Sequence, residues 1–314
     1  MLTGMANGIL GSLSLGLIWS FLAIGVFITF RVLDFADLSV DGTLALGAAV
    51  FAYLVTTNHD PFLSILLAFC AGLLGGLVTA LLHTLLKIPP LLSGILTMTA
   101  LYSVTLRVLN GANLSIHGQE TILTFFRRVT HIPQSIQLSD DINFGNFDAL
   151  VLTVILVVVI AVILYIFFGT EIGYALRATG SNPQMIRAQG VNTNTMKIIG
   201  LMLSNGLAAF SGALLVQNQG FATVTMGAGS IVIGLASVII GEVLFGTRSF
   251  KNSLISIILG SVIYRVVIAV VLELGMEPND TKLLTAAIIA LALALPLVKN
   301  GLLKLKKPLT GNHG

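Results

Sequence analysis

The stretch from Gly241 to Arg248 has the glycine spacing of a phosphate-binding loop. Such a loop follows the pattern G-x-x-x-x-G-K-[ST], but Thr247 stands where the lysine is required. Without that lysine the stretch cannot hold the phosphates of ATP, so we predict no ATP hydrolysis by this chain. The histidines lack metal-ligand spacing and Cys70 has no partner. The sequence therefore predicts no catalytic site, no metal site and no cofactor bound by the chain itself.

A polar segment, Glu171–Asn194, separates two long apolar runs. It predicts one short helix, a Ser-Asn-Pro break that supplies an N-cap and a first helical turn, and a second short helix. Such a compact unit suits docking of a soluble partner, although an amphipathic connector in the headgroup layer has the same pattern. The residues that we expect to contact the partner are Glu171, Arg177, Asn182, Pro183, Arg187 and Gly190.

Three aspartates, Asp34, Asp37 and Asp41, follow the first apolar run. Asp37 and Asp41 would repel each other on one helix face. Asp41 precedes Gly42-Thr43 and is a plausible N-cap for the helix that follows. The group could contact a basic partner surface, shape a broken helix start by hydrogen bonding, or form a proton or cation site.

Two further charges, Glu242 and Arg265, fall inside apolar runs. A charge at that depth costs a few kcal/mol, so it usually pairs, faces a cavity or extends to the interface. The two residues could pair with each other, and the sequence leaves all three possibilities open.

The connection 217–227 is rich in amide and hydroxyl groups, with aromatic and thioether side chains beside them. These groups suit a neutral or zwitterionic solute, and a polar outer turn would have the same composition. Together with two glycines of the repeat described below, the candidates for lining a solute pathway are Gly47, Gln217, Asn218, Gln219, Phe221, Met226 and Gly234.

The elements that must position these residues are membrane helices. The chain is 56% hydrophobic and 9% charged, with a mean hydropathy of +1.00, whereas soluble domains are roughly 25% charged. The apolar runs are continuous, which predicts an all-α polytopic membrane protein of about eight to ten helices. Nine crossings are expected, at 9–30, 42–57, 62–86, 90–109, 148–168, 196–216, 229–245, 253–272 and 282–298. The second and seventh are short and glycine-rich, so either could be broken or re-entrant.

The placement of lysine and arginine predicts the orientation. If Glu171–Asn194 is cytoplasmic, most basic residues are also cytoplasmic. These are Arg31, Lys87, Arg177, Arg187, Lys197, Arg248, Lys251, Lys299, Lys304, Lys306 and Lys307. They lie in short loops, which argues against nucleic-acid binding despite the pI of 9.1. Residues 1–314 then form a single transmembrane domain, and 110–147 form an external cap, a docking surface or a passive loop.

An internal similarity links the two halves of the chain. Gly42–Ala49 and Gly229–Ala236 share two glycines at the same spacing, a hydroxyl residue after the first glycine and an alanine two residues after the second. The first segment is expected to run outward and the second inward. This arrangement is typical of an inverted repeat, which in transporters surrounds the substrate path.

The stretch Gly173–Asn192, G-Y-A-L-R-A-T-G-S-N-P-Q-M-I-R-A-Q-G-V-N, resembles the cytoplasmic signature of ABC-importer permeases of the branched-chain amino acid, ribose and simple-sugar family. Ser204–Leu214 is similar to the small-residue helix that follows it there, and Asp34–Asp37 with the glycines after it resembles the family's second motif. Two departures are the additional acid at Asp34–Asp41 and Gly241-Glu242 in place of a Gly-Gly pair. They favour a subfamily associated with amino-acid binding lipoproteins, tryptophan-type among them, over a sugar permease.

The resemblance implies a plasma-membrane permease without its own ATPase site. It implies a homodimer in the lipid bilayer, a cytoplasmic ATPase that binds ATP and Mg, and an extracellular substrate-binding lipoprotein. The solute would be an amino acid, or alternatively a nucleoside or simple sugar, moved by alternating access. An ion-coupled secondary transporter or channel, and a membrane scaffold, are the competing functions.

Overall fold

The computed structural model describes residues 2–290 except 132, 134, 140, 141, 145, 146, 278, 279, 282, 288 and 289. The helices are α1 (Leu2–Phe27), η1 (Ile28–Val32), α2 (Ser39–Thr56), α3 (Pro61–Thr84), α4 (Pro90–Leu109), α5 (Ile122–Thr130), α6 (Phe147–Phe168), α7 (Glu171–Ser181), α8 (Pro183–Ala188), α9 (Thr193–Gln219), α10 (Ser230–Phe245) and α11 (Phe250–Glu273). The strands are β1 (Asn113–Ser115), β2 (Ile136–Ser139), β3 (Ile142–Phe144) and β4 (Phe221–Thr223).

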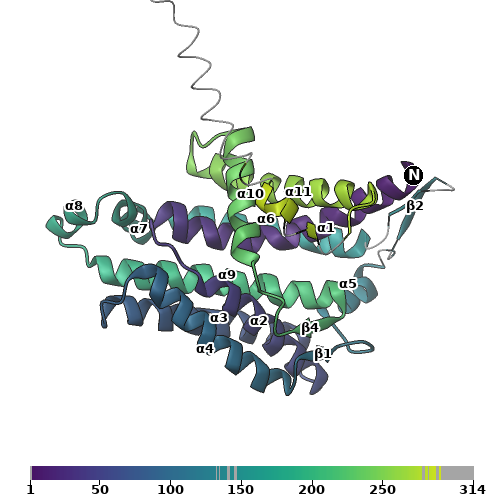
Figure 1. The fold of residues 1–314 in the computed structure, drawn as a ribbon, viewed down its shortest axis with the longest axis horizontal. Helices are drawn as coiled ribbons and strands as arrows, with labels where there is room; N and C mark the ends of the chain where they lie inside the picture. Colours follow the sequence, from purple (N-terminus) through teal and green to yellow (C-terminus); the bar gives the residue numbers. More distant parts are fainter. Residues whose placement is uncertain are drawn as a thin grey trace, which may run out of the picture.

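The fold is all-α and polytopic, as the composition predicts. Within the described ranges, seven helices are long and apolar enough to cross a membrane: α1 with η1, α2, α3, α4, α6, α9 and α11. Helix α10 has 16 residues and lies across the long helices (Figure 1). The crossing expected at 229–245 is therefore a short helix, and most of the crossing expected at 282–298 lies outside the described residues.

Two long helices, α1 and α9, form the centre of the bundle and run in opposite directions (Figure 1). Helix α9 packs against α2 and α3, while α1 packs against α10 and α11. Glycines permit this close approach. A Cβ at Gly47 in α2 would overlap the backbone of Ala209, and one at Gly212 in α9 would overlap the backbone of Leu44.

Each of these long helices is followed by a break and then by a helix that starts inside the molecule. After η1 the chain runs without helix from Leu33 to Leu38, with Asp34 at φ 51°, before α2 begins. After α9 comes β4 and a turn to Gly229 at φ 84°, before α10 begins. This correspondence supports the inverted repeat inferred from the two glycine-rich segments.

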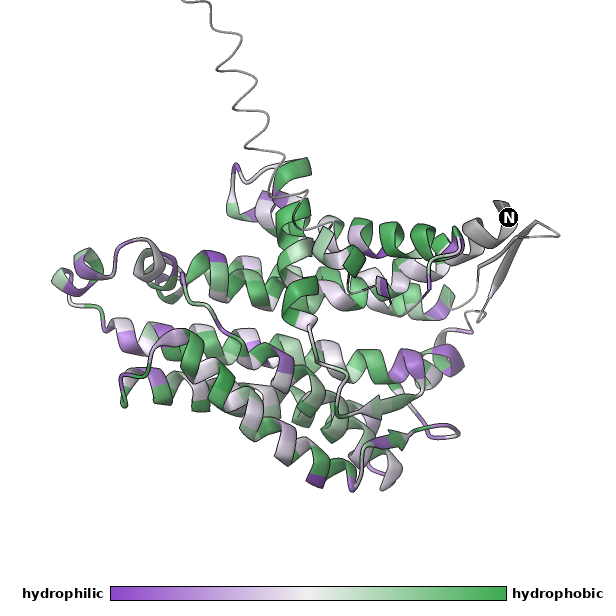
Figure 2. Cartoon of the chain, viewed as in Figure 1, coloured by the Kyte–Doolittle hydropathy of each residue, from purple (hydrophilic) through white to green (hydrophobic). Residues whose placement is uncertain are grey.

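The two ends of the bundle differ. Helices α7 and α8 project from one end, and short strands gather at the other (Figure 1). There β1 pairs with β4, and β2 with β3, both antiparallel. Apolar residues dominate the helices between the ends, while hydrophilic residues concentrate near the ends (Figure 2).

Candidate functional site

Helices α7 and α8 form the helix–break–helix that the sequence predicts. The side chain of Thr170 accepts a hydrogen bond from Gly173 N at 3.3 Å and caps α7. Asn182 accepts one from Met185 N at 3.0 Å and caps α8, with Pro183 in its first turn. The break and the second N-terminus are therefore encoded by adjacent residues.

The two short helices are attached firmly at α7 and loosely at α8. Helix α7 buries Gly173, Leu176 and Thr179. Its Gly180 packs so closely on Val32 that a Cβ there would overlap the Val32 carbonyl. Helix α8 buries only Ile186, and Glu171 and Gly190 are exposed. Most of α8 is thus available to a partner.

A basic hollow of about 530 Å³ lies on one side of this unit, where α1, α7 and α11 meet. It is lined by Arg31, Arg177 and Arg248 together with Asp34. Arg31 Nε donates to Glu242 Oε1 at 3.0 Å. The Arg177 guanidinium lies 5.3 Å from the centre of the Phe250 ring, a cation–π distance.

A second hollow, also about 530 Å³, lies on the other side, between the ends of α3 and α9. Its charged lining residues are Lys87, Arg187 and Lys197, all basic. His83 Nδ1 donates to the Ile88 carbonyl at 2.8 Å, so its Nε2 accepts from Lys197 Nζ at 2.9 Å. Arg187 Nε donates to Thr193 Oγ1 at 2.7 Å. Together the two hollows gather six basic residues around α7 and α8.

Asp37 shapes the start of α2 from a fully buried position. Its carboxylate accepts from Ser39 N at 2.9 Å, Ser39 Oγ at 2.6 Å and Asn205 Nδ2 at 2.8 Å. Thr43 Oγ1 donates to Asn205 Oδ1 at 2.8 Å. Because Asp37 is 0% exposed, it cannot touch a partner surface. Asn205 was not among the predicted residues; its only sequence signal was an amide within a helix of small residues.

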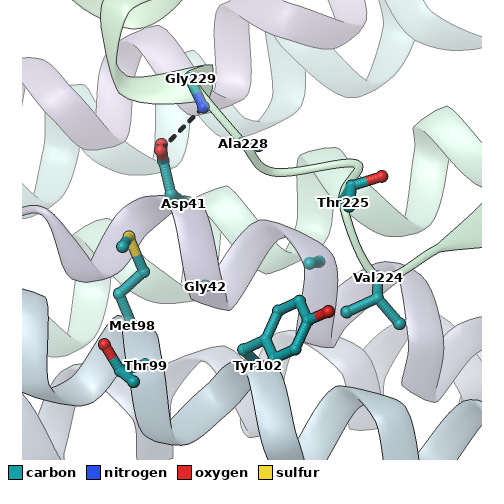
Figure 3. Close-up of a pocket in the computed structure, with 10 residues that line it drawn as sticks. Asp41, Gly42, Met98, Thr99, Tyr102, Val224, Thr225, Ala228 and Gly229 are labelled. Atoms are coloured by element: carbon teal, nitrogen blue, oxygen red, sulfur yellow. Dashed lines mark hydrogen bonds between the residues drawn. The ribbon is translucent and has the colours of Figure 1, made fainter. Parts of the chain in front are cut away.

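Asp41 does not cap its own helix, contrary to the N-cap prediction. Helix α2 starts at Ser39, so Asp41 lies within its first turn. The carboxylate instead accepts from the N-terminus of α10: from Gly229 N at 2.9 Å (Figure 3), and also from Ile231 N at 2.8 Å and Ser230 Oγ at 2.7 Å. A carboxylate at a helix N-terminus is stabilising. Asp41 therefore joins the start of α2 to the start of α10.

Glu242 and Arg265 do not pair with each other. Glu242 pairs with Arg31 at the α7–α8 end. The Arg265 guanidinium lies over the Trp19 ring, 4.5 Å from its centre. Both charges thus have partners that are distant in the sequence.

The predicted pathway residues are dispersed in the structure. Gly47 packs on Ala209, and Gly234 packs on Val26. Gln217 Oε1 accepts from Ile122 N at 3.1 Å, at the start of α5. The others lie nearby at that end: Asn218 and Met226 are partly buried, and Gln219 and Phe221 are exposed.

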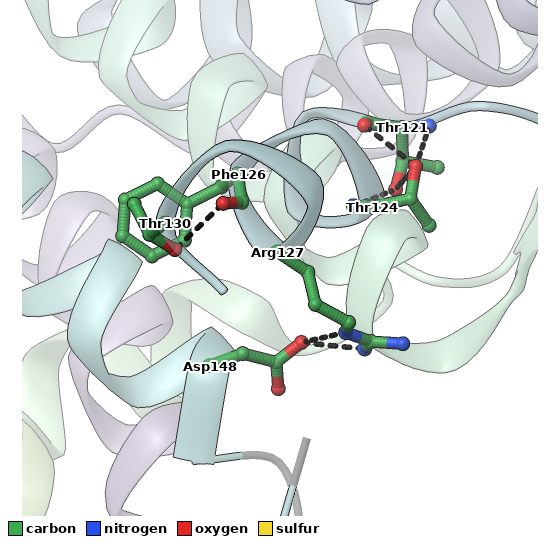
Figure 4. A network of polar contacts seen from close by, with 6 residues as sticks. All are labelled: Thr121, Thr124, Phe126, Arg127, Thr130 and Asp148. Atoms are coloured by element: carbon green, nitrogen blue, oxygen red, sulfur yellow. Dashed lines mark hydrogen bonds and ion pairs between the residues drawn. The ribbon is translucent and has the colours of Figure 1, made fainter. Parts of the chain in front are cut away.

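The segment 110–147 is anchored to the bundle at the end opposite α7 and α8. Arg127 Nε of α5 donates to Asp148 Oδ2 of α6 at 2.9 Å (Figure 4). Thr121 and Thr124 form a capping box at the start of α5. This part of the segment is a folded cover on the bundle.

Within the described ranges, no group of three or more acidic, histidine or cysteine side chains is placed to hold a metal ion. What the arrangement offers is a helix–break–helix flanked by two basic hollows at one end, a folded cover at the other and buried polar contacts where two helices begin.

Known proteins are similar to this chain over most of its length. A family described as "Branched-chain amino acid transport system / permease component" matches residues 8–293. A tyrosine transport system permease protein of Clostridioides difficile is 38% identical over 92% of this chain and 91% of its own length. A fructose import permease protein of Rhizobium meliloti is 26% identical over 82% of this chain and 69% of its own length. A ribose import permease protein of Bacillus subtilis is 26% identical over 65% of this chain and 59% of its own length.

Proposed function

Because this chain belongs to the family of branched-chain amino acid transport system permease components, we propose that it moves an amino acid inward by alternating access. It is a multi-pass protein of the plasma membrane and the permease subunit of an ABC importer. The amino-acid solute and the alternating-access mechanism are the proposal.

The docking unit α7–α8 is the single observation that carries the mechanism. We propose that a separate cytoplasmic ATPase, which binds ATP and Mg, seats on α8 between the two basic hollows. Met185 and Tyr174 are at least half exposed, and arginines and lysines surround them. This surface suits a groove on the ATPase that is lined by apolar and acidic residues. Closure of the ATPase pair then pushes on α7, which transmits the movement to η1 through the Gly180–Val32 contact.

The charge distribution supports the orientation. Six basic residues line the two hollows beside α7 and α8, and cytoplasmic loops of membrane proteins carry an excess of lysine and arginine. This end is therefore proposed to be cytoplasmic. The folded cover around α5 then faces outside, where a binding lipoprotein would deliver solute.

The proposed solute is an amino acid with an aromatic side chain. The tyrosine transport permease is considerably more similar to this chain than the two sugar permeases are. A second copy of the chain would complete a central pathway in the bilayer.

Charge reversal at the docking unit tests the coupling. We expect Arg177→Glu with Arg187→Glu to abolish co-purification of the ATPase and uptake of tyrosine. The matched control is Arg128→Glu at the opposite end, where Arg128 and its partner Glu120 are both exposed; it should retain the ATPase on purification. If the double variant stays folded and keeps both ATPase association and uptake, the coupling assignment is wrong.

A further inference from the structure

Two spanning helices of similar exposure differ in the polarity of their exposed residues. Over their most apolar stretches, 28% of α4 and 22% of α6 is buried within the chain, so both helices lie at the outside of the bundle. The exposed face of α6 in its middle carries Val154, Ile155, Val158, Val159, Val162 and Ile163. This is the composition expected of a helix that faces lipid.

The exposed residues of α4 include the apolar Leu91, Leu92, Leu96 and Val104, but a polar stripe runs beside them. Thr99, Tyr102 and Ser103 in the middle of the helix are exposed, as is Arg107 in its last turn, and their spacing places them along one side. Polar and charged side chains inside a membrane usually face a bundle interior or a water-filled cavity. The polar stripe therefore marks α4 as a wall of an aqueous space.

A cavity of about 370 Å³ opens beside this stripe (Figure 3). Small-molecule sites have volumes of roughly 300–1,000 Å³, so an amino acid fits. Three segments that are distant in the sequence form the cavity: the start of α2, the middle of α4 and the turn before α10. Its lining residues are Asp41, Gly42, Ala45, Met98, Thr99, Tyr102, Val224, Thr225, Ala228 and Gly229.

Asp41 gives the cavity its charge. A carboxylate can accept about four hydrogen bonds. Among the described residues, Asp41 accepts three, all from neutral donors at the start of α10. The positive end of the α10 dipole stabilises the ionised carboxylate. Among the described lining residues of the cavity none is cationic. An incoming ammonium group would supply the missing positive charge.

We propose that this cavity is a solute subsite on the transport pathway and takes a zwitterionic amino acid with an aromatic side chain. The α-ammonium group binds Asp41, and the aromatic ring packs against Met98 and Tyr102, which favour such contacts. The inference rests on the proposed function and names the site and the recognition chemistry within it. In this proposal the Asp41 carboxylate, which lies where α2 and α10 begin, both binds the solute and holds the two helices together.

Cysteine accessibility tests the wall of the pathway. In a Cys70→Ser background, Thr99→Cys and Ser103→Cys should react with a membrane-impermeant methanethiosulfonate at least about tenfold faster than Val158→Cys, because thiolate formation requires water. L-Tyrosine should slow the reaction at Thr99→Cys, which lines the cavity, and leave that at Val158→Cys unchanged. The measurement uses the assembled transporter in membranes.

The ammonium contact is tested with a matched pair of probes. L-Tyrosine should protect Thr99→Cys, whereas 3-(4-hydroxyphenyl)propionate, which lacks the amino group, should not. Adding Asp41→Asn, which keeps an oxygen for the cap of α10 but removes the charge, should abolish the difference. A thermal unfolding midpoint like that of the parent will show that the cap persists; if it falls, Asp41→Glu replaces it and should retain the difference.

The outcomes separate this inference from the proposed function. If uptake depends on the ATPase but Thr99→Cys is unreactive, or is protected equally by both probes, the subsite is wrong and the importer stands. If uptake proceeds without the ATPase, the proposed function is wrong whatever the labelling shows.

Discussion

At the residue scale, Asp37 shows how a carboxylate can be part of the interior of a membrane protein. It is fully buried and accepts hydrogen bonds from one backbone amide, one hydroxyl and one side-chain amide. Asn205 extends this contact by accepting from Thr43. These bonds join the start of α2 to the middle of α9, so we interpret Asp37 as a structural residue at the helix break.

Replacing Asp37 should therefore destabilise the protein. Asp37→Ala leaves Ser39 N and one hydrogen of Asn205 Nδ2 buried without their acceptor, which costs about 1–3 kcal/mol for each group. The Ser39 hydroxyl keeps Asn205 Oδ1 as an acceptor at 3.1 Å. We expect a clearly lower thermal unfolding midpoint in detergent. Glu120→Gln is the control, because Glu120 is exposed at the surface, and it should leave the midpoint unchanged. An unchanged midpoint for Asp37→Ala would instead favour the cation-site hypothesis.

At the element scale, the contact of α2 with α9 depends on the absence of side chains. Gly47 faces the backbone of Ala209, and Gly212 faces that of Leu44, so each helix lies in a groove of the other. Gly227 similarly packs on the Asp41 carbonyl at the turn before α10. Among the glycines shared by α2 and α10, close packing explains Gly47, whereas a Cβ at Gly229 would meet nothing within 4 Å and its φ of 84° favours glycine instead.

A single methyl group at Gly47 should disrupt this packing. Gly47→Ala places a Cβ onto the Ala209 backbone, which cannot move as a flexible side chain could, so we expect a lower yield of folded protein. Gly11→Ala is the matched control in α1, where a Cβ meets nothing within 4 Å; there the gain in helix propensity should leave the yield equal or higher. Equal yields for both variants would show that Gly47 has room around it and is free to line a pathway.

Local sequence patterns predicted most of the helices, whereas the partners of several charged residues depend on long-range contacts. Asn182 and Pro183 encode the break and cap of α8, so this helix–break–helix could be predicted residue by residue, while its docking role stays a prediction. Asp41 was misread because the start of α2 is set by Asp37 and Ser39, which moves Asp41 into the helix. The partners of Glu242 and Arg265 lie more than 200 residues away in the sequence, where spacing carries no information. The 229–245 run was expected to be a crossing or a broken or re-entrant helix, and the structure has a helix of 16 residues there.

At the scale of the whole molecule, three regions of the bundle present different surfaces. One end presents α8 between two basic hollows, the other is covered by α5 and short strands, and α4 presents a polar stripe between them. The α1–η1–α2 connection links these regions, since it touches α7 through Val32 and reaches the cavity through Asp41. A movement of α7 can therefore reach the proposed solute subsite through a few residues of one chain segment.

The most direct test of the central claim is uptake of labelled L-tyrosine into proteoliposomes containing the purified permease. The account predicts uptake only when the ATPase, the binding lipoprotein and ATP with Mg are all present, and none when ATP is replaced by a non-hydrolysable analogue. Uptake by this chain alone, driven by a proton or sodium gradient, would contradict it.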